Sequence, residues 1–442
     1  MPTRRRVVIT GLGPITAFGM GMDALWDAML AGRSAIARIR SFDPGGFPCQ
    51  IAAELSAEAF NVRDVVPRSY RKNTKVMCRD VDLAVGAAAA AVANAKLATK
   101  GTDPEAKPSI PPHRFGCQIG AGLIAADVDE LTAALVTSLR DDGEFDLGHW
   151  GRLGMQNLTP LWLLKYLPNM LACHVTIVHD CQGPSNTITC CEASAALSLG
   201  ESLRVIDRDG ADACLTGGVE SKLNPMAYIR LDFAGRLAPA RNGVDPTAVV
   251  KPFDSEANGT VMGEGGGLLV VEAAEIAQQR GAHVYAEIAG FAATQSFCPD
   301  TIGLELDADD PSISDAIETA LSNAGIAPEA IDAVVPFGSG IPSADRAEAA
   351  AIQRVFGARA AEIPIVTTIP FVGNCAAGNS AVSLCVGAKC LEAQKLPARL
   401  NTTRAEGLNA CAATARDADL HSALVMTTSQ GGQNAAIVLR RP

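Results

Sequence analysis

The chain has 442 residues, of which 48% are hydrophobic, so it carries enough apolar material for a large folded core of two or three domain-sized units. A formal net charge of −11 argues against broad contact with nucleic acid or with an anionic membrane surface, because like charges oppose the approach. The 13 cysteines are scattered without the paired spacing of a zinc site or a secreted disulfide framework, so we expect reduced thiols in a cytoplasmic protein.

The first hundred residues predict a strand followed by two helices. The strand covers residues 7–10, and Gly11-Leu12-Gly13-Pro14 ends its apolar run too early for a signal peptide. A helix is predicted over 23–30, with Gly32 as its stop. Residues 80–97 are nearly all Ala and Val, which indicates a helix packed on every side. We expect no membrane span, because no apolar stretch is long enough to cross a bilayer.

The same order of elements appears in both halves of the chain. Each half has a strand, a central helix, a second strand and a glycine-rich turn into a third strand. This repetition predicts a duplicated α/β core with its boundary near residues 280–283, dividing the chain into 1–280 and 281–442. The predicted elements are strands 186–189, 213–216 and 268–271 with helix 193–205, then strands 365–368, 423–427 and 435–439 with helix 380–391. Residues 102–113 and 141–160 are predicted as surface insertions.

A strand-to-helix turn at Cys190-Cys191-Glu192 is a candidate reactive site. The free amides and the dipole of a helix N-terminus favour negative charge, and they lower the pKa of a thiol placed there. Two cysteines at such a turn suggest a nucleophile. They are also compatible with small buried residues at the end of an interior strand, where free cysteine is common. The pattern alone leaves both interpretations open.

Taken together, several longer motifs resemble the β-ketoacyl synthases of the thiolase superfamily over essentially the whole chain. The resemblance implies an α/β, thiolase-like fold with a duplicated, five-layered αβαβα core, and a dimer that works with acyl carrier protein. It implies no cofactor and no metal ion. The matching segments are 7–13, 169–177, Gly183-Pro184-Ser185, Gly217-Gly218, 251–254, Gly263-Glu264-Gly265 and 345–348.

The resemblance places substitutions at every position that carries the chemistry of this family. Glu192 stands where the family has its nucleophilic cysteine, and Cys191 lies one residue earlier. The position of the first active-site histidine, before Gly338, is Phe337. The second histidine position, after Gly373, is Asn374, and the family lysine five residues before it corresponds to Ile369.

These substitutions predict that the chain does not condense acyl groups. An acyl group on Glu192 would be a mixed anhydride, which is more energetic than the thioester it came from. Phe337 offers no hydrogen bond to an oxyanion, and Asn374 cannot move a proton near neutral pH. The family includes a non-condensing type, the chain-length factor, which pairs with an active ketosynthase and carries Gln at the nucleophile position.

Three interpretations follow. The first is a chain-length-factor-like subunit of a type II fatty-acid or polyketide system that forms a heterodimer with an active ketosynthase. The second is an active β-ketoacyl synthase that uses Cys191 or Cys190 in a shifted register. The third is a homodimeric acyl-binding scaffold. In all three we expect dimerisation, because the segment 175–189 ends in a strand whose edge would pair across a two-fold axis.

The remaining site predictions concern a gate and a docking surface. The family has gating phenylalanines before its final Gly-Gly; here this region is Thr428, Gln430, Gly431 and Gly432. A basic cluster, Arg68, Arg71, Lys72 and Lys75, falls in the region where the family docks acyl carrier protein. We expect His174 and His179 to pack in the core or an interface. Leu161 to Leu167 is predicted to line a cavity shared by the two subunits.

Overall fold

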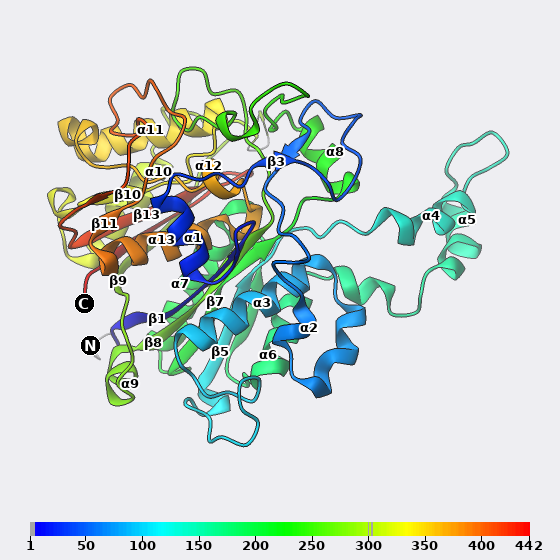
Figure 1. The fold of residues 1–442 in the computed structure, drawn as a ribbon, viewed down its shortest axis with the longest axis horizontal. Coiled ribbons are helices and arrows are strands. Elements are labelled where there is room, and N and C mark those ends of the chain that lie inside the picture. Colours follow the sequence, from blue (N-terminus) through cyan, green and yellow to red (C-terminus); the bar gives the residue numbers. More distant parts are fainter. Residues whose placement is uncertain (1–4, 299, 302–303) are drawn as a thin grey trace.

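The computed structural model describes residues 5–298, 300–301 and 304–442 (Figure 1). Within these residues, ten strands form one sheet in the order β10-β13-β14-β9-β1-β8-β7-β5-β6, with β2 paired to β1. Two short pairs, β3 with β4 and β11 with β12, lie apart from it. The strands are β1 (Val7–Thr16), β2 (Gly19–Met20), β3 (Ala37–Arg38), β4 (Ile51–Ala52), β5 (Phe115–Gly120), β6 (Ser185–Ile188), β7 (Ala213–Glu220), β8 (Gly265–Ala273), β9 (Ala286–Gln295), β10 (Ala333–Val335), β11 (Lys395–Leu396), β12 (Arg416–Asp417), β13 (Ser422–Thr428) and β14 (Gln433–Arg440).

Helices cover both faces of each half of this sheet. Two of them, α7 and α13, pack against each other and lie between the halves, since α7 contacts β7 and β5 while α13 contacts β13 and β8. The α-helices are α1 (Met22–Leu30), α2 (Val62–Val65), α3 (Arg79–Asn94), α4 (Val128–Val136), α5 (Leu147–Arg152), α6 (Met170–His179), α7 (Ser194–Asp207), α8 (Pro225–Phe233), α9 (Ala274–Gln279), α10 (Ser312–Ala324), α11 (Pro342–Phe356), α12 (Ile369–Val372) and α13 (Asn379–Ala393).

The two halves repeat one topology. In the first, β8 runs antiparallel to β1 and β7, and β5 lies parallel to β7 and β6. In the second, β14 runs antiparallel to β9 and β13, and β10 lies parallel to β13. The halves join where β1 pairs with β9. With α3 and α6 outside the first half-sheet and α10 and α11 outside the second, the layers are αβαβα, as expected.

The packing explains two features of the sequence. Helix α3 is rich in Ala because it lies close to β1 and β8 on one side and α6 on the other. A Cβ added at Gly13 of β1 would come within 2.3 Å of the Ala87 carbonyl oxygen of this helix. A Cβ at Gly200 of α7 would meet the Phe291 ring of β9 at 2.2 Å. Small residues therefore set the distance between the layers.

One predicted strand is wrong. Residues 365–368 form only an isolated bridge between Ile365 and Val334, because Pro364 has no amide to donate and Pro370 lies in the first turn of the short helix α12. The other predicted elements are present, with ends that differ by a few residues. All 13 cysteines are free thiols, as expected. Among the described residues, no helix is both long and apolar enough to cross a bilayer.

An arm formed by residues 127–168 extends away from the body of the molecule and carries α4 and α5 (Figure 1). Its base is tied by Glu130, which forms an ion pair with Lys165 and accepts a hydrogen bond from Tyr166 Oη at 2.7 Å. The arm contains the insertion predicted at 141–160. The insertion predicted at 102–113 is a loop that leads into β5.

Candidate functional site

Two tight turns, each at the N-terminus of a central helix, meet in the middle of the molecule. The first contains η5 (Cys191–Ala193) before α7, and the second contains η9 (Ala376–Gly378) before α13. In each turn one non-glycine residue has positive φ, which is 46° at both Cys191 and Ala376. L-residues rarely adopt this conformation, and it is concentrated at functional sites. The match in φ shows that the duplicated fold builds the same turn twice.

The Glu192 side chain follows the first turn and is buried. Its Oε1 accepts a hydrogen bond from Arg236 Nη2 at 2.6 Å and lies 3.4 Å from Asn374 Nδ2. Its Oε2 accepts a hydrogen bond from the Gln430 amide at 3.0 Å. Through these contacts the carboxylate links the first turn to three other segments: the second turn, the segment after α8, and the turn between β13 and β14.

The surroundings of Glu192 stabilise its charged form. Burial alone would raise the pKa of this carboxyl, but the Arg236 guanidinium and the donors around it hold the pKa below its ordinary value. Glu192 is therefore a carboxylate near neutral pH, and it is already paired with a cation. A group in this state is neither a general acid nor an available nucleophile.

A pocket of about 510 Å³ opens beside this carboxylate. Its wall includes Cys191, Glu192 and Asn374 from the two turns, and Gln430 and Gly431 from the β13–β14 turn. Helix α8 and its C-terminal neighbour supply most of the opposite lining: Ala227, Arg230, Leu231 and Ala234. Among the described residues that line this pocket, none is a histidine.

Cys191 lines the pocket and is accessible from it. Partial removal from bulk water, together with the charges of Glu192 and Glu220, raises the pKa of its thiol to about 12. Burial also raises the pKa of Cys190, whose amide donates to Ser194 Oγ at 2.8 Å. Both thiols are therefore protonated near neutral pH, in contrast to the reactive thiolate that a helix N-terminus can produce.

Phe337 and Ile369 do not line the pocket. Their side chains are 1% and 0% exposed and belong to one apolar cluster with Met262. The Phe337 backbone is held by the buried Glu348 carboxyl group, which accepts from the Phe337 amide at 2.9 Å and the Gly338 amide at 2.8 Å. Of the four positions that the resemblance marks as substituted, the structure thus brings Glu192 and Asn374 together and places Phe337 and Ile369 in the core.

Three residues of the site were not identified from the sequence. Arg236 is 5% exposed and neutralises Glu192 from 44 positions away in the chain. Glu220, at the end of β7, forms an ion pair with Lys222 and accepts from the Ala377 amide at 2.9 Å. The position of Glu220 two residues after Gly217-Gly218 was an available signal. No signal in the sequence pointed to Arg236, because its contact with Glu192 forms only in the folded chain.

The region predicted as a gate is a tight turn with a polar base. Gln430 and Gly431 line the pocket. Thr428 is fully buried and donates to Asn434 Oδ1 at 2.7 Å, while the Gly432 carbonyl accepts from the Ser296 amide at 2.8 Å. Hydrogen bonds therefore hold this turn.

The basic cluster lies on the surface, away from Glu192. Arg68, Arg71, Lys72 and Lys75 are all exposed on the 3₁₀ helix η1 (Arg68–Val76). A neighbouring residue of η1, Tyr70, places its Oη 2.8 Å from His174 Nδ1. Burial lowers the pKa of His174, so this histidine is a neutral anchor for the basic helix.

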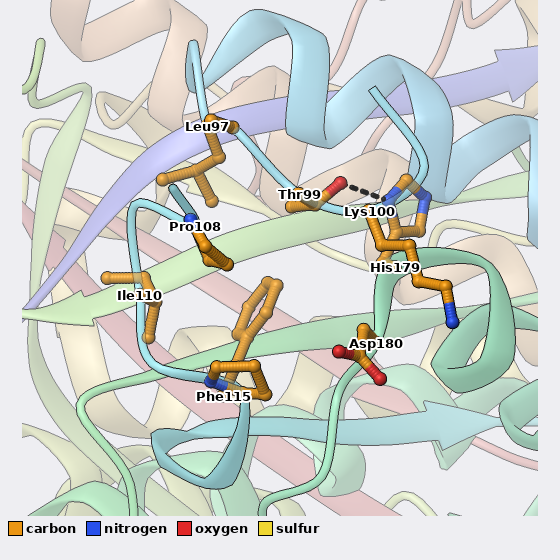
Figure 2. Close-up of a pocket in the computed structure, with 10 residues that line it drawn as sticks. Leu97, Thr99, Lys100, Pro108, Ile110, Phe115, His179 and Asp180 are labelled. Atoms are coloured by element: carbon orange, nitrogen blue, oxygen red, sulfur yellow. Dashed lines mark hydrogen bonds between the residues drawn. The ribbon is translucent and has the colours of Figure 1, made fainter. Parts of the chain in front are cut away.

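His179 is also a packing residue, and Figure 2 shows its environment. Its Nδ1 lies 2.9 Å from Thr99 Oγ1, next to a cavity of about 10 Å³, which has room for about one water molecule. Burial lowers the pKa of His179 to about 4. Both histidines therefore have the packing roles expected of them, and neither lines the pocket beside Glu192.

Comparison with known proteins identifies the family. Residues 4–277 match the family model described as "Beta-ketoacyl synthase, N-terminal domain", and residues 285–403 match the one described as "Beta-ketoacyl synthase, C-terminal domain". The chain belongs to the β-ketoacyl synthase family, whose members build fatty acids and polyketides.

Relatives cover the chain from end to end. The "Putative polyketide beta-ketoacyl synthase 1" of Streptomyces halstedii is 32% identical, over 99% of this chain and 98% of that protein. The "3-oxoacyl-[acyl-carrier-protein] synthase 2" of Coxiella burnetii is 28% identical, over 99% of this chain and 99% of that protein.

Solved structures of similar proteins also cover the chain. A β-ketoacyl synthase from Burkholderia phymatum has a TM-score of 0.81 at 25% identity, covering 99% of this chain and 100% of that one. "The ishigamide ketosynthase/chain length factor" has a TM-score of 0.80 at 26% identity, with 100% of both chains covered. The fold is therefore the thiolase-like fold of ketosynthases.

Proposed function

We propose that this chain is a non-condensing ketosynthase subunit that works as a chain-length-factor-like partner of an active ketosynthase. The observation that carries the proposal is the state of Glu192. The residue at the nucleophile position is a buried carboxylate, paired with Arg236 and hydrogen bonded to Gln430. A carboxylate in these contacts cannot accept and keep an acyl group.

The rest of the pocket supports the same conclusion. Condensation needs donors that stabilise an enolate oxygen and a group that assists decarboxylation. Asn374 is the one substituted histidine position that faces Glu192, and Phe337 is enclosed in the core. Loss of a single oxyanion donor costs on the order of 10² to 10³ in rate, so loss of the nucleophile and both imidazoles leaves no useful turnover.

Two surfaces support pairing with another subunit. Strand β6 ends the sheet and exposes Ser185 and Asn186, which leaves its outer edge available to a further strand. Nearby in sequence, η4 (Trp162–Tyr166) and its neighbour expose Leu161 and Leu163 by 57% and 58%. Exposed leucines that lie close together on a projecting arm often mark a surface that a partner covers.

We propose that the cavity shared by the two subunits lies beside η4. Lys165 and Tyr166 line a pocket of about 660 Å³. The loops after β5 and β7 line both this pocket and the one beside Glu192, but with different residues. In this proposal the chain shapes the space into which the partner's product grows, and η1 is the surface that contacts acyl carrier protein.

One observation favours a second candidate, an active synthase. Cys191 lies in the pocket at a turn with φ of 46°, as a nucleophile would. Its raised pKa argues against this role. Labelling with an acyl-thioester probe, followed by peptide mapping, separates the two candidates. Adducts on Cys191 or Cys190 would favour the synthase.

The test of the proposal is co-expression with a ketosynthase that retains its cysteine and both histidines. We expect a stable heterodimer whose turnover survives Glu192→Gln in this chain. A Leu163→Trp change should shift the product length, because it adds volume beside the proposed cavity. The matched control is Leu147→Trp, an exposed leucine farther along the arm. Loss of turnover in a folded Glu192→Gln complex would contradict the proposal. A homodimer that binds no ketosynthase would favour the acyl-binding scaffold instead.

A further inference from the structure

The β13–β14 turn, defined as residues 429–432, is held by hydrogen bonds to several of its backbone groups. The Gly432 amide donates to the Ser429 carbonyl at 2.9 Å, and the Gly432 carbonyl accepts from the Ser296 amide. The Gly431 carbonyl accepts from Gln295 Nε2 at 2.6 Å. Hydrogen bonds to β9 and its extension therefore fix one side of the turn.

Side chains fix the base of the same turn. Ser429 Oγ donates to Gln433, with 2.9 Å to Oε1 and 3.1 Å to the carbonyl oxygen. Below it, Asn434 donates from Nδ2 to Ser296 Oγ at 2.9 Å and accepts from Thr428. Thr428, Asn434 and Ser296 are buried and hydrogen bonded to one another, and buried networks of this kind specify one arrangement of the chain.

On its opposite side, the turn contacts Glu192 in the wall of the pocket. The Gln430 amide donates to Glu192 Oε2 at 3.0 Å, while Glu192 Oε1 is paired with Arg236. A hydrogen bond to a charged carboxylate is about twice as strong as one between neutral groups. The charge of Glu192 in turn depends on Arg236, because an unpaired buried carboxylate would take up a proton.

We infer that Arg236 is a positioning residue: by keeping Glu192 ionised, it holds the β13–β14 turn in one conformation against the first helix turn. The pocket beside Glu192 consequently has a fixed wall where Gln430 and Gly431 line it. This inference concerns the isolated chain, and it does not depend on whether the chain pairs with a ketosynthase.

Hydrogen–deuterium exchange of the purified full chain tests the inference, with peptides that cover residues 427–434. We expect slow exchange in the wild type. In Arg236→Met, exchange of the Gln430 amide should be about 10- to 100-fold faster, as loss of one charge-assisted hydrogen bond allows. Arg236→Lys keeps the charge and should restore most of the protection. Glu192→Gln keeps the shape without the charge and should give an intermediate rate.

The matched control is Glu130→Gln, which breaks an ion pair with Lys165 at the base of the arm. It should leave exchange in residues 427–434 unchanged. If Arg236→Met does not fold, the comparison of Glu192→Gln with the wild type decides the question. The inference would be overturned if the Gln430 amide exchanged at the wild-type rate in both Glu192→Gln and Arg236→Met while these variants remained folded. An increase spread evenly over β13 and β14, without a larger effect at the turn, would also overturn it.

Discussion

Glu192 and Arg236 form an ion pair in the interior, with 2.6 Å between Oε1 and Nη2 and each side chain only 6% exposed. Buried ion pairs rarely stabilise a protein more than apolar residues of the same volume would. Removing one partner is costly, however, because the other charge is left buried and unpaired. The two residues therefore depend on each other, and a substitution at one position is tolerated best with a change at the other.

This dependence sets the stability of single and double variants. Glu192→Ala should lower the free energy of unfolding by about 3–5 kcal/mol, the usual cost of breaking a buried pair. Replacing both residues by Met should recover most of the loss, because no charge remains buried. Urea unfolding of both single variants and the double variant measures the coupling. Strictly additive single effects would show that the two side chains do not depend on each other.

The pair also sets a pH dependence. The pKa of Glu192 is lower in the folded chain than in the unfolded chain, so its contribution to stability is fully present above the ordinary Glu pKa. The contribution is lost as the pH falls through the lower, folded value. The stability difference between the wild type and Glu192→Gln should therefore be constant near neutral pH and shrink in acid. A difference that grows as the pH falls would contradict this assignment.

A thiol introduced at position 192 should be reactive without being catalytic. In Glu192→Cys, the neighbouring Arg236 cation should lower the pKa of the introduced thiol and speed its alkylation by iodoacetamide. Condensation of acyl and malonyl thioesters should stay at background, because Phe337 and Asn374 supply no imidazole. The control for alkylation is the same variant with Cys191→Ala. Turnover by Glu192→Cys alone would show that the imidazoles are not needed.

His179 should contribute to acid sensitivity. Its pKa is about 4 in the folded chain and near 6.5 in the unfolded chain, so the unfolded chain binds a proton first as the pH falls. Stability from this residue is present above pH 6.5 and is lost toward pH 4. His179→Gln should flatten the decline over this range. Equal slopes for the wild type and His179→Gln would contradict the burial argument.

The sequence predicted the parts of the molecule that depend on local pattern. The turn before α7 was predicted from the approach of a strand to an Ala-rich helix, and Glu192 and Asn374 were assigned from the resemblance to the β-ketoacyl synthases. The strand at 365–368 was wrong because two prolines override its β-branched composition. His174 and His179 were correctly expected to pack, although the Tyr70 partner of His174 lies 104 residues away.

The contacts that define the site could not be predicted, because they join distant segments. Nothing near Arg236 in the sequence indicates that its guanidinium reaches Glu192. Phe337 is buried in an apolar cluster with Met262 and Ile369, which come from other parts of the chain. The polar base of the β13–β14 turn likewise joins Asn434 to Ser296, 138 residues apart. Pairings of this kind appear only once the layers are assembled.

The central claim is that this chain carries no acyl group during synthesis. Intact-mass measurement of both subunits, after the complex is mixed with acyl-loaded carrier protein, tests it most directly. We expect the acyl adduct on the active ketosynthase alone, with the mass of this chain unchanged. Stoichiometric acylation of this chain, mapped to Cys191 or Cys190 and abolished by the corresponding Ala variant, would contradict the account.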